Sequence, residues 1–169
     1  ERRIVVVSSA EEVADLAAGA IGVWSGAAAV PGRLRPGRAH RGAGAAQLAW
    51  IDQGTDLVLD GVCQALVTGP VSKAAIATSG APGARRFRGH TEHLAARLRA
   101  DEVVMAFASR RLITALVTTH LPLRRVARAI DPEAVASACY WLASMLTRLR
   151  GPGARIAVAS LNPHAGEAG

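Results

Sequence analysis

The stretch VTGPVSK, residues 67–73, spans the end of what reads as a buried strand, Gln64–Thr68, and the start of a short helix, Val71–Thr78. Three further motifs place a histidine beside Gly or Pro in the same way: GHTEHL (89–94), VTTHLPL (117–123) and LNPHAGE (161–167). Ligands of α/β sheets bind at the carboxyl ends of the strands. We therefore expect an α/β fold whose site is built from several loops.

The composition agrees with a soluble α/β protein. Half of the 169 residues are apolar and only 4% are aromatic, which suits Val-rich buried strands and Ala-rich helices. No apolar run reaches the roughly 18 residues that span a bilayer, and no signal peptide is visible. Cys63 and Cys139 have no motif spacing, so we expect reduced thiols. These features predict a cytoplasmic protein without a membrane partner.

The chain is strongly basic, with a formal charge of +7 and 19 arginines, and Lys73 is its single lysine. An arginine face that binds nucleic acid would explain such a charge. The arginines are scattered in twos and threes, however, and no aromatic residues are interleaved to stack on bases. We therefore expect no nucleic-acid partner, and the charge suits a small anionic substrate.

The pattern predicts alternating strands and helices. Ser9 and Glu12 form a capping-box pattern, which predicts a helix from Ser9 to about residue 18. The Gly-, Pro- and Arg-rich residues 25–43 predict a loop or a poorly ordered segment. The remaining expected strands are Arg3–Val7, Val103–Ala108, Leu112–Thr118 and Arg155–Ser160, and the remaining helices are Ala45–Val62, Thr91–Arg99, Leu123–Ala129 and a long helix from Asp131 to about Arg150. A turn at 109–111 predicts that the two middle strands are antiparallel.

Two histidines stand where strands are expected to end. His120 follows an apolar run, and His164 lies in a similar position, with Asn162 and Glu167 nearby. A neutral imidazole there can bind a metal ion, although each histidine could also simply hydrogen-bond to loop backbone. Two ligands do not complete a catalytic metal site, so at least one further ligand is needed.

A second group of residues suits an anion. His90 and Thr91 begin a helix whose free N–H groups attract phosphate or carboxylate, or Thr91 is only the N-cap. Lys73 lies in the first turn of its helix, where a cation opposes the macrodipole, so it either binds an anion, donates a proton or is merely solvated. We expect Glu92 to complement a helix dipole and His93 to pack or lie at the surface. The spacing at Lys73 is not that of a P-loop, and no GxGxxG motif is present.

Together the four motifs, in this order and spacing, resemble the 4-hydroxythreonine-4-phosphate dehydrogenase family of pyridoxal phosphate biosynthesis. The resemblance runs from about Ala45 to the end of the chain and includes FRGHTEHLA (87–95) and LITALVTTHLPL (112–123). It implies an isopropylmalate-dehydrogenase-like fold with α/β/α layers and a mixed sheet. It also implies a homodimer with the site near its interface, NAD(P) as oxidant, and oxidation followed by decarboxylation of 4-phosphooxy-L-threonine.

The resemblance assigns roles to individual residues. It makes His120 and His164 two of three histidines that hold a divalent metal (Zn, Mg or Co), and it makes His90 and Thr91 the substrate-binding pair. Lys73 matches a lysine of the family's TGPxxK segment and is the expected catalytic residue. Cofactor-binding residues remain unassigned.

The third metal-binding histidine and much of the nucleotide site are not among the 169 residues. We therefore expect a single partial α/β unit from the central part of a longer two-domain enzyme, inactive by itself. Related hydroxy acids remain possible substrates, namely 4-phosphoerythronate, 4-phosphothreonate and carboxylated dihydrodiols. A non-catalytic, anion-binding remnant is the remaining alternative.

Overall fold

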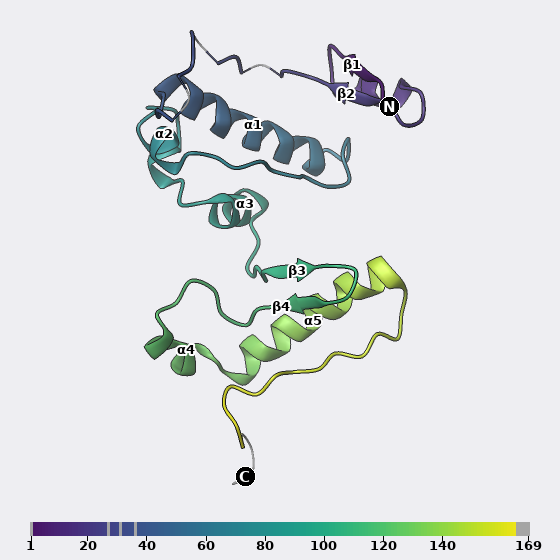
Figure 1. Cartoon of the computed structure of the whole chain (residues 1–169), viewed down its shortest axis with the longest axis vertical. Coiled ribbons are helices and arrows are strands. Elements are labelled where there is room, and N and C mark those ends of the chain that lie inside the picture. The colour runs from purple at the N-terminus through teal and green to yellow at the C-terminus, as the bar shows by residue number, and fades with distance from the viewer. Residues whose placement is uncertain (1, 27, 31, 36, 165–169) are drawn as a thin grey trace. The chain divides into compact units, whose positions relative to one another are not determined.

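The computed structural model describes residues 2–26, 28–30, 32–35 and 37–164 (Figure 1). Their contacts gather in two compact units, Glu1–Asp101 and Glu102–Gly169, which are described separately below. The single partial α/β unit expected from the sequence stays a prediction. Among the described residues, no helix is both long and apolar enough to cross a bilayer. Cys63 and Cys139 are free thiols, as predicted.

The first unit begins with two short parallel strands, β1 (Ile4–Val6) and β2 (Ile21–Val23), joined through a 3₁₀ helix, Glu11–Asp15. The first strand is confirmed, whereas β2 was not foreseen. The predicted capping box at Ser9 is wrong, because Ala10 precedes the helix and no side chain caps it. Glu12 instead accepts a hydrogen bond from the Ser8 N–H at 2.9 Å, so the reach-back contact forms at an earlier residue.

Three helices form the body of the first unit: α1 (Arg41–Leu59), α2 (Lys73–Ala77) and α3 (His90–Leu98) (Figure 1). All three were predicted, but α1 begins at Arg41 rather than Ala45. The predicted loop therefore ends at His40, whose Nδ1 accepts a hydrogen bond from the Ala43 N–H at 3.3 Å and caps the helix. No role was predicted for His40, so this cap was missed.

The core of the first unit joins these helices through one apolar cluster. α1 buries residues at helical spacing, including Leu48 and Ile51, against Ile76 of α2. Ile76 is fully buried, and Phe87 packs into the same cluster from the segment that precedes α3. A second 3₁₀ helix, Ala84–Arg86, lies within this segment and was not foreseen.

The closest approach in this core is between the backbones of α1 and α2. A Cβ atom on Gly44 would lie 2.1 Å from the Ala75 carbonyl oxygen and 2.7 Å from the Ile76 nitrogen. No rotamer change can relieve a clash with backbone atoms, so only glycine allows the two helices to pack at this separation. The start of α2, and with it Lys73, is thereby held against α1.

Two predicted strands are absent from the described residues. Residues 64–68 and 155–160 form no helix or strand, and no described strand pairs with either segment. Val67 is 93% exposed and Val158 is 62% exposed, so the prediction of a buried strand at Gln64–Thr68 is wrong. Apolar, β-branched sequence favours extended backbone, but a strand also requires a neighbour that completes its hydrogen bonds.

The second unit starts with an antiparallel hairpin, β3 (Ala106–Ala108) and β4 (Ile113–Ala115). The Ser109 hydroxyl organises the turn by accepting hydrogen bonds from the N–H groups of Arg111 and Leu112, as a short polar turn residue is expected to do. The antiparallel pairing and the turn are confirmed, although both strands are shorter than predicted.

Two helices complete the second unit, α4 (Leu123–Ala129) and α5 (Pro132–Arg150). Both are confirmed, including the cap, because Asp131 Oδ1 accepts a hydrogen bond from the Ala134 N–H at 2.7 Å.

A cavity of about 270 Å³ in this unit is lined by α5 and by two further segments, residues 115–118 and 156–159. Glu102 ties the start of the unit to α5, since its Oε2 accepts hydrogen bonds from Ser137 Oγ at 2.8 Å and Trp141 Nε1 at 3.0 Å.

The approach of α1 to α2 predicts that Gly44→Ala lowers the free energy of unfolding by about 1–3 kcal/mol, because the added methyl group overpacks a backbone contact. Gly54→Ala, in the same helix, is the matched control. The Cβ there would meet only the Leu66 side chain, at 2.7 Å, which can move, while alanine favours the helix by about 1 kcal/mol. Urea unfolding of both variants tests this, and equal stability of the two would contradict the packing described.

The Glu102 contacts predict a pH dependence of stability. Hydrogen bonds from Trp141, and secondarily from Ser137, lower the pKa of the Glu102 carboxyl below its ordinary value of 4.5. A depressed pKa in the folded state stabilises the protein above the unfolded-state pKa, and this stabilisation is lost as the pH falls through the folded-state pKa. Urea midpoints of Glu102→Gln should therefore fall less steeply below pH 4.5 than those of the parent chain.

Trp141→Phe should flatten the acid slope in the same way, because it removes the larger of the two causes of the shift. Tyr140→Phe is the control on the neighbouring residue, since no hydrogen bond from Tyr140 to Glu102 exists among the described residues. An unchanged slope in both Glu102→Gln and Trp141→Phe would show that this carboxylate does not contribute.

Candidate functional site

Lys73, the predicted catalytic residue, is the first residue of α2 and is solvent-exposed. Ser72 positions this helix start, because its Oγ accepts a hydrogen bond from the Ala75 N–H at 3.2 Å. The side chain of Lys73 reaches the start of α3. A Cβ atom on Gly89 would lie 3.3 Å from Lys73 Nζ and 3.0 Å from Glu92 Oε2. The structure thus brings an ammonium and a carboxylate to the residue that precedes His90.

The electrostatics of this cluster favour an anion. Lys73 carries a positive charge at the positive end of α2, and Gly89 is the N-cap of α3, so the ammonium also lies at the positive end of a second helix. No side chain caps α3, because Gly89 has none. Glu92, in the first turn of α3, complements this charge as predicted. Its one negative charge does not balance the ammonium together with the positive ends of two helices.

His90 and Thr91 occupy the first two positions of α3. The alternative in which Thr91 is the N-cap is therefore wrong. Thr91 is exposed, whereas the Nε2 atom of His90 is buried and has no hydrogen-bond partner within the described part of the chain. The Phe87 ring packs edge-on to the His90 ring, with centroids 6.1 Å apart. A buried imidazole nitrogen without a partner is energetically costly.

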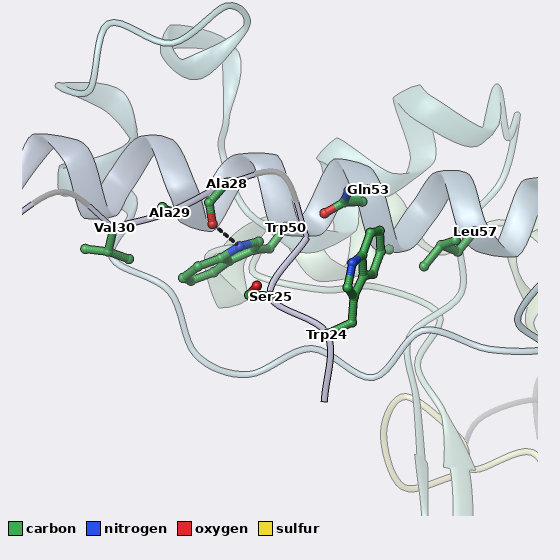
Figure 2. A pocket seen from close by; sticks show the side chains of 9 residues that line it. Trp24, Ser25, Ala28, Ala29, Val30, Trp50, Gln53 and Leu57 are labelled. Carbon is green, nitrogen blue, oxygen red and sulfur yellow. Dashed lines mark hydrogen bonds between the residues drawn. The ribbon is translucent and has the colours of Figure 1, made fainter. Parts of the chain in front are cut away.

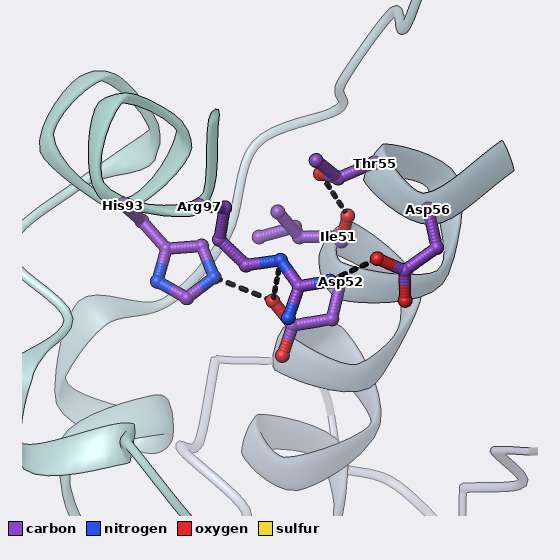
Figure 3. Close-up of polar contacts among 6 residues, drawn as sticks. All are labelled: Ile51, Asp52, Thr55, Asp56, His93 and Arg97. Carbon is purple, nitrogen blue, oxygen red and sulfur yellow. Dashed lines mark hydrogen bonds and ion pairs between the residues drawn. The ribbon is translucent and has the colours of Figure 1, made fainter. Parts of the chain in front are cut away.

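A polar contact between α1 and α3 holds the latter helix in place (Figure 3). His93 Nε2 lies 2.6 Å from Asp52 Oδ1, and Arg97 contacts both Asp52 and Asp56. Each helix contributes two residues four positions apart, which lie on one face. The expectation that His93 packs is confirmed by this contact and by the Phe87 ring, whose centroid lies 5.3 Å from that of His93.

Sequence reasoning missed a cavity of about 400 Å³ beside α1 (Figure 2). Trp24 and Trp50 line it, and in this view their rings stand on either side of Ser25. The Trp50 indole N–H donates a hydrogen bond to the Ala28 carbonyl oxygen at 3.0 Å and so ties the loop to the helix. The sequence feature that could have indicated this cavity is the presence of Trp24 and Trp50, two of only six aromatic residues in the chain.

The two predicted metal ligands lie in the second unit, His120 in a bend and His164 in a turn, rather than at strand ends. β4 ends at Ala115, and both His120 and His164 are exposed. Both have left-handed backbone, with φ of +55° at His120 and +58° at His164, and Arg99 is the third described non-glycine residue with positive φ. Such backbone costs roughly 1–3 kcal/mol per residue and concentrates at functional positions.

The donor types fit a divalent metal, since exposed imidazoles are common ligands of such ions. The set is incomplete, however. Within the described ranges no three His, Cys, Asp or Glu side chains converge as a metal site would require. The described residues therefore offer two imidazoles on residues with left-handed backbone, and further ligands would have to come from elsewhere.

Comparison with known proteins identifies relatives along nearly the whole chain. Residues 2–169 match the family model of the pyridoxal phosphate biosynthetic protein PdxA. The 4-hydroxythreonine-4-phosphate dehydrogenase of Acidithiobacillus ferrooxidans is 45% identical over 138 residues, which cover 80% of this chain and 40% of that protein. The Pseudomonas aeruginosa enzyme of the same name is 40% identical over 153 residues, which cover 90% of this chain and 45% of that protein.

Solved structures agree with these sequence relatives. The 4-hydroxythreonine-4-phosphate dehydrogenase of Klebsiella pneumoniae superposes with a TM-score of 0.82 at 29% identity, over 99% of this chain and 49% of that one. The protein of the same name from Burkholderia phymatum gives a TM-score of 0.79 at 29% identity, again over 99% of this chain and 49% of that one. These neighbours confirm the α/β fold class, and the chain spans about half their length or less. The chain belongs to the PdxA family.

Proposed function

We propose that this chain is part of a longer enzyme that oxidises 4-phosphooxy-L-threonine with NAD(P)+ and then releases CO2, in pyridoxal phosphate biosynthesis. The match of residues 2–169 to the PdxA family carries the proposal. It is supported by the names of the relatives, which are 4-hydroxythreonine-4-phosphate dehydrogenases. Because the chain covers about 40–45% of these two relatives, we propose that it is inactive alone.

The proposed roles divide between the two units. In the second unit, His120 and His164 would hold a divalent ion (Zn, Mg or Co), together with a ligand from outside these 169 residues. A bound ion would supply Lewis-acid chemistry at the oxygen of the substrate's hydroxyl group. In support, both histidines are exposed and have left-handed backbone, which concentrates at functional positions.

In the first unit, Lys73, His90 and Thr91 would bind the anionic substrate. The Lys73 ammonium at two helix starts attracts a carboxylate or phosphate, and the free N–H groups of the first turn of α3 donate to the same anion. The buried His90 Nε2 would find in the substrate the partner that the described chain does not provide. Lys73 is also placed to hand a proton to a bound substrate, which is the catalytic role we propose for it.

The remaining proposals concern cofactor and partners. We propose NAD(P) as the oxidant, with its binding residues unassigned, a homodimer with the site near its interface, and a cytoplasmic location. The free thiols of Cys63 and Cys139 are consistent with a reducing compartment. The other hydroxy acids named above would satisfy the same anion cluster. The non-catalytic alternative is favoured by one observation: no three possible metal ligands gather among the described residues.

Turnover tests this proposal. The chain and a protein extended to the length of its relatives are each mixed with 4-phosphooxy-L-threonine, NAD(P)+ and a divalent cation. We expect only the longer protein to reduce NAD(P)+, and His120→Asn or His164→Asn to lower its activity roughly a hundredfold or more. Asparagine tolerates left-handed backbone, so both variants should fold.

Arg99→Asn is the matched control, because Arg99 has the same left-handed backbone, with φ of +51°, but no proposed ligand role. It should keep full activity. Turnover by the 169-residue chain would overturn the proposal that it is inactive alone. Absence of turnover in the longer protein with every tested hydroxy acid would favour the non-catalytic alternative.

Lys73→Met tests the two roles proposed for the lysine. Lys73 is exposed, so the fold should be unaffected. Loss of one charge-assisted hydrogen bond to an anion should raise KM about tenfold or more. A fall in kcat at unchanged KM would instead identify proton donation, and Lys73→Arg should rescue only the binding role, because arginine remains protonated. Unchanged kcat and KM in Lys73→Met would remove Lys73 from the site.

A further inference from the structure

A cavity of about 350 Å³ lies in the first unit, between the loop that precedes α1 and the start of α2. Its volume falls within the roughly 300–1,000 Å³ typical of small-molecule sites. Its polar lining side chains come from three places, the loop, α1 and the N-cap of α2, and they are Arg35, Arg38, His40, Gln47 and Ser72. Neither Lys73 nor any residue of α3 lines it, so this cavity is distinct from the cluster at Gly89.

The side-chain acceptors of this cavity are already occupied by backbone N–H groups. His40 Nδ1 accepts from Ala43, Gln47 Oε1 accepts from Ser72 at 3.0 Å, and Ser72 Oγ accepts from Ala75 at 3.2 Å. A backbone N–H can only donate, so these contacts fix the orientation of the Gln47 amide and the tautomer of neutral His40.

The side chains are consequently left with donors. The proton of neutral His40 must lie on Nε2, the Gln47 amide keeps its NH2 group, and the Ser72 hydroxyl keeps its hydrogen. Arg35 and Arg38 add guanidinium groups, which have donors and no acceptor. A cavity whose side chains offer five donor groups, and whose three side-chain acceptor atoms each already accept a hydrogen bond, is complementary to a ligand that only accepts.

The charge around the cavity has the same sign. No Asp or Glu occurs between Asp15 and Asp52, whereas four arginines fall in that interval. α1, which is 19 residues long, starts at His40 and has no acidic residue in its first turn, so its positive end is uncompensated there. The lining itself contains no carboxylate.

We propose that this cavity binds a phosphoryl group, held by Arg35 and Arg38 and by the His40 Nε2–H, Gln47 and Ser72 donors. Phosphate presents several acceptor oxygens and a double negative charge, and arginine recognises it through paired N–H groups. Such a group could belong to a nucleotide or to a phosphorylated hydroxy acid. The inference does not depend on the dehydrogenase activity proposed above, because binding is measured without turnover.

Calorimetric titration of the chain with inorganic phosphate tests this site at physiological ionic strength, where charges farther than about 8 Å are screened. We expect saturable binding that Arg35→Gln and Arg38→Gln each weaken about tenfold, which corresponds to the loss of one charge-assisted hydrogen bond. Arg33→Gln is the matched control, because Arg33 is exposed in the same loop but does not line the cavity. It should leave the affinity unchanged.

His40→Asp separates binding from folding. Aspartate is a favoured N-cap and can accept from the Ala43 N–H, so the stability of α1 should be kept. It also places a negative charge in the cavity, so phosphate binding should be lost. Displacement of phosphate by NADP+ would assign the site to a nucleotide, and displacement by O-phospho-L-threonine would assign it to a hydroxy-acid phosphate; either result supports the proposal.

Two results would overturn it. One is the absence of saturable phosphate binding by the parent chain. The other is an equal loss of affinity in Arg33→Gln, Arg35→Gln and Arg38→Gln, which would show that the net charge of the surface attracts phosphate and that the cavity does not.

Discussion

The backbone contact between α1 and α2 at Gly44 is the constraint on which the first unit depends. A Cβ atom there would lie 2.1 Å from a carbonyl oxygen of α2, so the two helices can approach only because this residue has no side chain. The same approach buries Ile76 completely and places Lys73, at the first position of α2, within reach of Gly89. The position of the candidate catalytic lysine is therefore a consequence of helix packing some distance away in the sequence.

Electrostatics explain why this packing produces positively charged surfaces. The ammonium of Lys73 and the starts of α2 and α3 carry charge of one sign, and the loop before α1 adds arginines to the positive end of another helix. Folding gathers these groups at a cost in repulsion, which a bound anion would offset. The second unit offers a different chemistry, two imidazoles on residues with left-handed backbone.

The features that depend on local sequence were predictable. Asp131 and Pro132 signal the start of α5, a polar tight turn signals the β3–β4 hairpin, and all five α-helices were placed with the right type. The absence of strands at 64–68 and 155–160 was not predictable, because apolar sequence favours extended backbone but does not show whether a hydrogen-bonded neighbour is present. β2 was missed because three residues give too short a pattern to read.

The same distinction between local sequence features and tertiary contacts applies to the candidate site residues. Lys73 and His90 could be named as candidates because each stands in a motif with turn residues, and their helices begin within two residues of the predicted starts. The His40 cap and the donor-lined cavity beside it could not be found, because they arise where residues 35–47 meet Ser72 across a tertiary contact. The left-handed backbone of His120 and His164 is likewise invisible in a single sequence, since neither residue type requires it.

Anomalous diffraction from crystals of the extended protein, soaked with Zn²⁺ and 4-phosphooxy-L-threonine, would test the division of roles most directly. The account predicts an anomalous peak bonded to the imidazoles of His120 and His164, with the substrate's anionic groups at Lys73, His90 and Thr91. A peak at His90 or His93, or a substrate bound away from Lys73, would contradict it.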